Sequence, residues 1–346
     1  MKQIIGVVFG GKSGEHDVSL MSASNVIDEI DLNKYEVVKI GISRTGQWMI
    51  YTGDTKNIAQ GTWEQDEDNL IKGFSIFDHP TVKAVDVFFP ILHGPNGEDG
   101  TVQGLFKLLN KPFVGCGVLA SSVGMDKVYS KILFEKVGIP TGDYIALQRS
   151  QWKQRDEDFI LSIEERLEYP LFVKPANMGS SVGISKVHHR EEMLKGIEEA
   201  FQYDSKLILE KAINCREIEC AVLGNEEPIA SILGEIIPSQ EFYDYEAKYA
   251  DGNKSDLIIP AKTDKETTEK IQEYAIRAFN CINGKGLSRV DFFIDKDSGD
   301  IFINEINTLP GFTNISMYPK LWEASGISYA DLIERIITLA MEEFNN

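Results

Sequence analysis

The first third of the chain alternates apolar runs with segments of helical periodicity. Three strand-like runs occupy residues 4–9, 37–42 and 87–92, and the first ends in Gly10-Gly11. Helix-like segments follow at 19–30 and 100–109. Strands that alternate with helices pair in parallel. We therefore expect an N-terminal three-layer α/β domain, with the polar and acidic residues 54–72 as a surface excursion.

The middle of the chain has a different pattern. Asp126 is a good N-cap for a helix that runs to about residue 137. Short strand-like runs then follow one another at 171–174, 181–187, 206–213 and 217–223, with a charged helix at 190–201. Neighbouring strands joined by short links favour antiparallel pairing. The last third predicts a helix at 265–280, strands at 288–295 and 301–307, and a closing helix from 328.

Composition excludes several classes of protein. The 346 residues carry 35 Lys and Arg against 54 Asp and Glu, a net charge of −19. This charge argues against a non-specific nucleic-acid binder. No apolar run reaches the length of a membrane span, and residues 4–9 are too short for the apolar core of a signal peptide. The four cysteines form no CxxC pair, and we interpret them as structural thiols of a cytoplasmic protein rather than as a zinc site or a disulfide.

Two strands near the C-terminus predict a hairpin with a polar face. If the hairpin is symmetric about residue 298, Asp291 lies opposite Glu305 and Arg289 opposite Asn307. All four side chains then project from one face. The other face carries Val290, Phe292, Ile294, Phe302 and Ile306, while Phe293 and Ile303 fall on the polar face. Two carboxylates and an amide oxygen suit Mg²⁺, and a solvated Arg–Asp ion pair is the alternative.

Two further segments are suited to phosphate or metal chemistry. The turn at Pro310-Gly311 follows Asn307 and places free backbone N–H groups beside the proposed metal. Residues 174–183, KPANMGSSVG, lie between two strands, and so do not form the phosphate loop that opens a helix. The N–H groups and hydroxyls of this loop, with Lys174 at its root, are able to surround phosphate oxygens. An ordinary flexible hairpin loop is the alternative.

Two loops follow strands of the N-terminal sheet. Residues 10–15, GGKSGE, lack the GxGxxG spacing of a dinucleotide site, which disfavours an NADP-linked oxidoreductase that would use Arg44. Glu15 and His93 both follow strands, so we expect them at the same carboxyl edge, where open α/β sheets bind ligands. Glu98 and Asp99 are interpreted as favouring the start of the next helix.

Taken in order, the motifs resemble the D-alanine–D-alanine ligase family of ATP-grasp enzymes. They are GGKSGEHDVSL at 10–20, LHGPNGEDGTVQG at 92–104, MDK at 125–127, KPANMGSSVGISKV at 174–187, EFYDYEAKY at 241–249, SRVD at 288–291 and NEINTLPGFTNISMYP at 304–319. The resemblance covers nearly the whole chain. It implies an α/β ATP-grasp fold of three domains, at 1–126, 127–213 and 214–346. The first would hold the parallel sheet, and the other two would hold ATP between them.

The resemblance also implies a reaction. The family joins two D-alanines for peptidoglycan synthesis, with ATP first phosphorylating one carboxylate and the amine of the second amino acid then attacking the acyl phosphate. By this resemblance Asp291, Glu305 and Asn307 are ligands of two Mg²⁺ ions, for which Mn²⁺ is a substitute. Lys127, Lys174 and Ser181 contact phosphates, and Lys248 reaches the transferring phosphoryl group when its segment closes. Adenine and ribose are held by Glu210, Lys211, Ile213 and Glu217.

The substrate residues follow from the same resemblance. Glu15 binds the ammonium of the first D-alanine and is linked through Ser180 to Tyr249, with His93 nearby. Arg289 and the Gly311 N–H stabilise the oxyanion, and Ser316 holds the carboxylate of the second D-alanine. A homodimer is usual in this family.

The second substrate is a finer question, because related ligases make D-Ala–D-Ser or D-Ala–D-lactate. The Lys248-Tyr249 pair and the apolar Met317 favour D-alanine, whereas Asn314-Ile315 replace the Ser-His often found before Ser316. A nucleotide-sensing paralogue without activity is disfavoured by the intact set Lys127, Lys174, Arg289, Asp291, Glu305 and Asn307.

Overall fold

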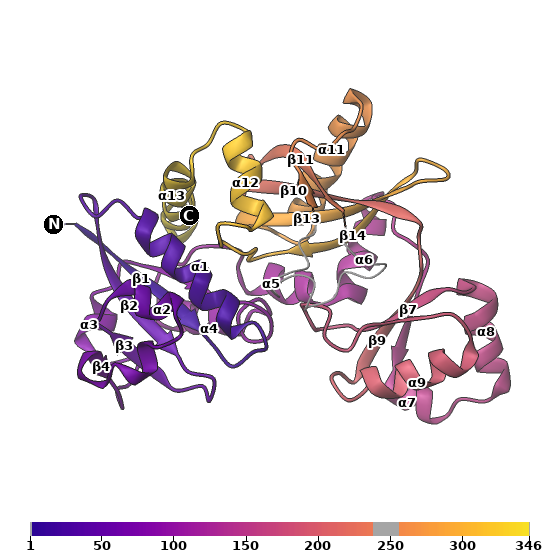
Figure 1. The fold of residues 1–346 in the computed structure, drawn as a ribbon, viewed down its shortest axis with the longest axis horizontal. Helices are drawn as coiled ribbons and strands as arrows, with labels where there is room; N and C mark the ends of the chain where they lie inside the picture. Colours follow the sequence, from indigo (N-terminus) through magenta and orange to yellow (C-terminus); the bar gives the residue numbers. More distant parts are fainter. Residues whose placement is uncertain (1, 238–255, 346) are drawn as a thin grey trace.

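Three sheets make up the computed structural model, which describes residues 2–237 and 256–345. Figure 1 shows them as three masses: an N-terminal sheet, a small sheet at the far side of the molecule, and a C-terminal sheet between and above them. The architecture is α/β with one sheet that contains parallel strands and two antiparallel sheets. The expected division of the fold is therefore present, while the domain boundaries drawn from the sequence remain a prediction.

The N-terminal sheet has the strand order β4-β3-β2-β1-β5. Its strands are β1 (Gln3–Gly10), β2 (Tyr35–Ile42), β3 (Trp48–Tyr51), β4 (Leu70–Ile71) and β5 (Val87–Ile91). Strand β1 pairs in parallel with both β2 and β5, as the alternating pattern predicts. Its helices are α1 (His16–Glu29), α2 (Thr55–Ala59), α3 (Pro80–Lys83) and α4 (Thr101–Leu108), with short 3-10 turns η1 (Trp63–Gln65) and η2 (Glu67–Asn69).

A smaller sheet, in the order β6-β9-β7-β8, is antiparallel throughout. It consists of β6 (Tyr144–Gln148), β7 (Leu171–Pro175), β8 (Ser185–Val187) and β9 (Lys206–Lys211). Helices α7 (Arg149–Lys153), α8 (Glu157–Leu167) and α9 (Arg190–Ala200) lie around it (Figure 1). One face, with Leu171, Val173, Leu207 and Leu209, forms a core of its own with Met193 and Ile197 of α9.

The C-terminal sheet follows the order β12-β11-β10-β13-β14 and is also antiparallel. Its strands are β10 (Cys215–Gly224), β11 (Ile229–Ile237), β12 (Asp256–Ile258), β13 (Gly286–Asp295) and β14 (Ile301–Asn307). The surrounding helices are α5 (Val118–Met125), α6 (Lys127–Lys136), α11 (Lys265–Cys281), α12 (Met317–Ala324) and α13 (Tyr329–Asn345). One face packs on α11, where Ile218 and Val290 meet Ile271 and Phe279.

The opposite face of this sheet is apolar near one end and charged near the other. Near one end Ala221, Leu223 and Leu287 join a core with α12, α13 and the N-terminal sheet. Near the other end, the same face carries Glu219, Arg289 and Asp291, because alternate residues of a strand share a face. The sheet thus anchors the N-terminal domain with one half of a face and presents charged groups with the other half.

Several elements differ from the sequence-based expectation. Residues 54–72 are more than a surface excursion, because Trp63 and Ile58 are fully buried and β4 adds a strand to the sheet. The sequence pattern also missed β3, whose four residues are too short to show alternation. Strand β8 begins at Ser185 rather than at residue 181. Asp126 does cap α6, accepting from the N–H groups of Val128 and Tyr129.

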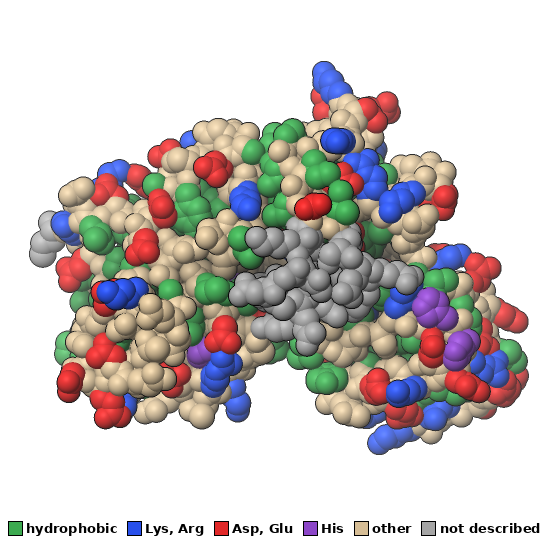
Figure 2. All heavy atoms as spheres, viewed as in Figure 1, with side chains coloured by type: hydrophobic (Ala, Val, Ile, Leu, Met, Phe, Trp, Pro, Cys, Tyr) green, Lys and Arg blue, Asp and Glu red, His purple; other side chains and the backbone are tan. Residues whose placement is uncertain are grey.

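Charged side chains are scattered over the face that Figure 2 shows, with acidic groups on all three masses. Within residues 2–237 and 256–345, no helix has the length and apolarity needed to cross a membrane. All four cysteines are free thiols, and Cys116 and Cys220 are buried. This agrees with their interpretation as structural thiols.

Candidate active site

The hairpin of β13 and β14 brings four predicted residues together. Arg289 pairs with Asn307 and Asp291 with Glu305, as expected from symmetry about residue 298. The Arg289 guanidinium donates twice to Asp291, with Nε–Oδ1 and Nη2–Oδ2 distances of 2.7 Å. Asn307 Nδ2 donates to Asp291 Oδ2 at 3.0 Å. The prediction of a shared polar face is confirmed.

Beyond Asp291 the register of the hairpin shifts by one residue. Phe292 pairs with Ile303 and Phe293 with Phe302, so that Asn304 is the extra residue of a bulge. The expected placement of Phe302 on the core face and Ile303 on the polar face is therefore wrong. Ile303 is 1% exposed in the core, whereas Phe302 is half-buried opposite Phe293. The bulge lets Ile303 face the core while the two carboxylates stay on the polar face of the hairpin.

Buried carboxylates hold the Arg289 side chain. Besides Asp291, Glu219 on the neighbouring strand β10 lies 3.0 Å from Arg289 Nε. Burial opposes the charge, but Asp291 and Glu219 outweigh it and raise the pKa of Arg289 well above its usual value. Arg289 is therefore a permanent cation with a fixed orientation. Sequence analysis missed Glu219, although the spacing of Glu217 and Glu219 on one strand face was a usable signal.

The donor set of the hairpin fits a magnesium ion. Asp291 and Glu305 offer hard carboxylate oxygens from opposite positions of a strand pair, and Asn307 offers an amide oxygen. Lys127 Nζ lies 3.7 Å from Glu305 Oε2. In the described part of the chain, no three His, Cys, Asp or Glu side chains gather as a metal site. An ion at this hairpin would thus be held by two carboxylates and an amide, in competition with Arg289 for Asp291.

The glycine-rich loop between β7 and β8 is irregular over a longer stretch than expected. Ser180, Ser181 and Gly183 have φ values of 50°, 59° and 71°, in the left-handed region. Two such residues other than glycine are unusual, and backbone strain of this kind gathers at binding sites. The loop is tied at Met178, whose carbonyl accepts from Lys127 Nζ at 2.7 Å, and at Ser180, which donates to Glu15.

The root of this loop carries a buried cluster of charges. Glu210 on β9 accepts from Lys174 on β7 at 2.5 Å and from Lys131 on α6 at 2.8 Å. Burial opposes its charge, but the two lysines outweigh this and lower the pKa of Glu210. Burial likewise opposes the charge of Lys174, but Glu210 raises the pKa of that lysine. Sequence analysis did not single out Lys131, because a lysine inside a helix gives no signal of burial.

The other predicted nucleotide residues lie where the chain passes from the small sheet to the C-terminal sheet. Lys211 ends β9 and is exposed, with an ion pair to Glu168 at 2.6 Å. Ile213 is half-buried in the link, and Glu217 lies on β10. Lys248 and Tyr249 lie outside the residues that the structure describes.

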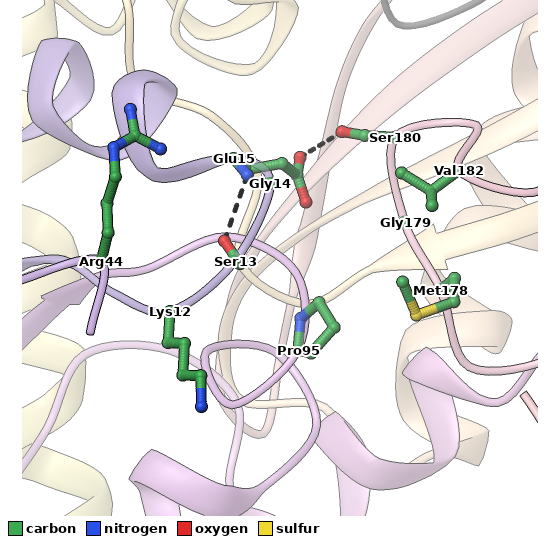
Figure 3. A pocket seen from close by; sticks show the side chains of 10 residues that line it. All are labelled: Lys12, Ser13, Gly14, Glu15, Arg44, Pro95, Met178, Gly179, Ser180 and Val182. Carbon is green, nitrogen blue, oxygen red and sulfur yellow. Dashed lines mark hydrogen bonds between the residues drawn. The ribbon is translucent and has the colours of Figure 1, made fainter. Parts of the chain in front are cut away.

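The N-terminal side of the site contains a cavity of about 460 Å³. Figure 3 shows the Glu15 carboxylate pointing at Ser180 across this cavity, with Lys12 and Arg44 on the side away from the loop. The walls are formed by Lys12, Ser13, Gly14, Glu15, Arg44, Pro95, Met178, Gly179, Ser180 and Val182. The Glu15 carboxylate is suited to bind the ammonium group of a small zwitterion in this cavity.

His93 and Glu98 are two further ionisable residues near Glu15. His93 is 5% exposed, and its Nε2 lies 3.4 Å from Ser22 Oγ. Burial lowers the pKa of His93. Glu98 Oε2 accepts from the Gly94 N–H at 2.9 Å, and burial followed by the charge of Glu15 raises the pKa of Glu98 well above its usual value. Asp99 supports the start of α4 through the Thr101 N–H, whereas Glu98 accepts from the Gly94 N–H in the preceding loop.

Gly311 and Ser316 lie against each other at the start of α12. Ser316 Oγ accepts from the Thr313 N–H at 3.0 Å, and a Cβ added at Gly311 would come within 2.8 Å of that oxygen. A side chain at position 311 would therefore require Ser316 to move. The structure does not bring the Met317 side chain into this group. Met317 is 5% exposed and packs on Gly234 in the core, and its expected place beside the second substrate stays a prediction.

Comparisons with known proteins agree with this geometry. Family models described as the D-ala D-ala ligase N-terminus and C-terminus match residues 4–116 and 133–338. A D-alanine–D-alanine ligase of Ruminiclostridium cellulolyticum is 52% identical, covering 100% of this chain and 97% of that protein. One of Clostridium novyi is 50% identical with full coverage of both chains.

Solved structures give the same result. The VanG D-Ala:D-Ser ligase of Enterococcus faecalis superposes with a TM-score of 0.88 at 39% identity, over 98% of this chain and 100% of that one. The D-alanine–D-alanine ligase of Coxiella burnetii superposes with a TM-score of 0.87 at 36% identity, over 99% of this chain and 95% of that one. With the ATP-grasp arrangement of sheets and the charged face of its hairpin, the chain belongs to the D-alanine–D-alanine ligase family.

Proposed function

We propose that the protein uses ATP to join two D-alanines into D-alanyl-D-alanine, for peptidoglycan precursors. The observation that carries this proposal is the set of contacts that joins three parts of the site: Lys127 links the glycine-rich loop to Glu305 of the hairpin, and Ser180 of that loop donates to Glu15 at the cavity. The full-length relatives at about 50% identity bear the name of this activity. ATP use follows from family membership.

The first step is phosphorylation of a D-alanine carboxylate. Glu15 holds the ammonium of this substrate, with Ser180 and Tyr249 completing the contact and His93 behind it. Lys127, Lys174, Ser181 and Lys248 bind and orient the phosphates, and Glu210, Lys211, Ile213 and Glu217 hold adenine and ribose. Phosphoryl transfer depends chiefly on positioning and on charge neutralisation. Cationic groups that converge from α6 and β7 supply both.

Two Mg²⁺ ions, or Mn²⁺ as a substitute, would be held by Asp291, Glu305 and Asn307 and would neutralise negative charge on the phosphate oxygens. Support comes from the donor chemistry of the hairpin, where hard oxygen ligands share one face. Arg289 keeps Asp291 oriented and is itself fixed by Glu219.

The second step is attack of the second D-alanine's amine on the acyl phosphate. Arg289 and the Gly311 N–H stabilise the developing oxyanion, and Ser316 holds the incoming carboxylate. Donors fixed before the reaction stabilise such charge effectively, because they need not reorganise. Arg289 meets this condition through its two carboxylate partners.

A D-Ala–D-Ser ligase is the second candidate, because a neighbour at 39% identity bears that name. It is less favoured, since the more similar relatives are named D-alanine–D-alanine ligases. We further propose that the protein acts in the cytoplasm as a homodimer. Its free thiols support a reducing compartment.

ATP-dependent phosphate release tests the function, first with D-alanine alone and then with D-serine or D-lactate added, with products identified by mass. Release with D-alanine alone and a D-Ala–D-Ala product is the expected result. Release only with a mixed pair would move the specificity to the second candidate. No release with any pair, from folded protein that binds ATP, would contradict the proposal.

A further inference from the structure

The Glu210 carboxylate lies between two lysines that come from different elements. Its Oε1 is 2.8 Å from Lys131 Nζ, and its Oε2 is 2.5 Å from Lys174 Nζ. The side chains of Lys131, Lys174 and Glu210 are only 3%, 12% and 10% exposed. Both oxygens of one carboxylate are therefore used by two separate cations inside the protein.

The elements explain why the two lysines meet there. Glu210 lies opposite Phe172 of β7. Lys174 is two residues further along β7, so its side chain projects from the same face as Phe172. Lys131 reaches this face from α6, because Val128, one helical turn before it, packs on Ile208 and Ala176 of the small sheet. Lys127, one turn before Lys131 on the same helix, contacts the glycine-rich loop.

The two cations are not equivalent in their surroundings. Lys174 lies at the root of the glycine-rich loop, and the charges of Glu305 and Glu217 also act to raise its pKa. Lys131 contacts the Glu210 carboxylate and lies over the ring of Tyr144, with its ammonium 5.9 Å from the ring centre. One carboxylate with two lysines leaves the cluster with a surplus positive charge in a chain of net charge −19.

The second lysine matters when the Lys174 ammonium leaves Glu210 to bind a phosphate. A buried carboxylate left without a counter-ion is strongly destabilising. With Lys131 in place, Glu210 keeps a cation when Lys174 leaves it. Without Lys131, Lys174 would be the sole partner of Glu210 within this cluster, and its transfer to a phosphate would carry that penalty.

We propose that Lys131 is a positioning residue for nucleotide binding, acting as the permanent counter-ion of Glu210 so that Lys174 is available to the phosphates of ATP. The proposal rests on the phosphate role proposed above for Lys174. It assigns no contact with the substrate to Lys131 itself.

The test measures ATP binding to the full-length protein by calorimetry, together with steady-state KM values for ATP and D-alanine. Lys131→Met should weaken ATP binding about tenfold, the usual effect of losing a hydrogen bond to a charged group. KM for ATP should rise by a similar factor, whereas KM for D-alanine should change by less than about twofold. Lys136→Met is the matched control, because Lys136 is an exposed lysine on the same helix.

Two further variants separate positioning from simple loss of structure. Lys131→Met combined with Glu210→Gln removes the carboxylate that needs a counter-ion. Because Glu210 is also proposed to contact adenine, the reference is Glu210→Gln alone, and adding Lys131→Met to it should change ATP affinity by less than about twofold. Lys131→Arg keeps the charge and should retain most of the affinity. If Lys131→Met does not fold, the comparison of Glu210→Gln with the double variant carries the test, since neither contains an unpaired carboxylate and a large loss of ATP affinity between them would contradict the proposal.

The outcomes distinguish this proposal from the nucleotide site on which it rests. If Lys174→Met leaves ATP binding unchanged, the phosphate role of Lys174 is wrong and the proposal falls with it. If Lys174→Met weakens ATP binding but Lys131→Met does not, only the role of Lys131 is wrong. Equal increases in both KM values for Lys131→Met, or a loss of ATP affinity on adding Lys131→Met to Glu210→Gln as large as in the wild-type protein, would likewise overturn it.

Discussion

At the scale of single residues, the site consists of charges held by opposite charges. Arg289 is fixed by Asp291 and Glu219, and Glu210 by Lys131 and Lys174. Each of these buried charged groups contacts a group of opposite charge, which offsets part of the free-energy cost of removing it from water. Arg289 is therefore orientated before substrate arrives.

Replacing Glu305 tests the metal assignment. Glu305→Gln keeps the size of the side chain but removes the charge of a proposed Mg²⁺ ligand, so we expect kcat to fall by about 10³-fold or more. The fold should persist, since Glu305 is only half-buried. Steady-state kinetics at several Mg²⁺ concentrations and a thermal melt measure both effects.

Asp300→Asn is the control, because Asp300 is an exposed carboxylate in the turn of the same hairpin. Wild-type turnover in Glu305→Gln would remove Glu305 from the metal site.

Glu98 gives the protein a pH dependence of stability. Its folded pKa is raised, so its contribution is fully present below the ordinary carboxyl pKa of about 4.3 and is lost as pH rises towards the raised value. Glu98→Gln keeps an acceptor for the Gly94 N–H without a charge. We expect this variant to gain stability over wild type at pH 8 and to lose that advantage near pH 4, as measured by urea unfolding.

Glu36→Gln, at an exposed position on β2 of the same domain, serves as the reference for this comparison. A constant difference between Glu98→Gln and wild type at every pH would show that Glu98 does not titrate as described.

The limits of prediction are visible in these same residues. The pairing of Asp291 with Glu305 followed from strand alternation and a short turn. The bulge at Asn304 could not be foreseen, since it depends on which of Phe302 and Ile303 fits the core. Lys131 was missed, and Glu98 was assigned only to the start of a helix, because the surroundings of a charged residue depend on partners distant in sequence, which no local pattern contains.

At the scale of elements, α6 connects the parts of the site. Asp126 caps the helix and also pairs with Lys206 of β9, Lys127 contacts the glycine-rich loop and lies near Glu305, and Lys131 reaches Glu210. One helix therefore positions groups on both antiparallel sheets. The N-cap was predictable from sequence, but its ion pair to another sheet was not.

The cap of α6 is testable by substitution. Asp126→Ala removes two accepted N–H bonds and leaves the Lys206 ammonium without this partner, so we expect about 2–4 kcal/mol of lost stability in urea unfolding. Asp264→Ala removes the cap of α11, where Asp264 accepts from the Thr267 N–H, and should cost about 1 kcal/mol. Equal losses in the two variants would mean that the ion pair to Lys206 adds nothing.

At the scale of the whole molecule, the beginning and the end of the chain share one core. Ile5, Val7 and Phe89 of the N-terminal sheet lie in the same apolar cluster as Leu332 and Ile336 of α13. The small sheet has a separate core around Leu171 and Ile197. We infer that the N-terminal and C-terminal parts stabilise each other more than either stabilises the small sheet.

Hydrogen exchange checks this inference. Leu332→Ala opens a cavity at a fully buried position and should lose about 2–5 kcal/mol of stability. Exchange should quicken in β1 and β10 together, with little change in β7 and β9. Ile163→Ala, in the core of the small sheet, should give the reverse pattern. Uniform loss of protection in both variants would indicate one cooperative core.

The shared core also bears on how the chain is synthesised. Strand β5 of the first sheet is complete at residue 91, but the helix that covers part of its apolar face ends at residue 345. At the usual 5–20 residues per second, a ribosome takes roughly 10 to 50 s over that interval. During this time the nascent N-terminal domain exposes Phe89 and its neighbours to the cell, so this surface is where we expect a chaperone to bind the growing chain.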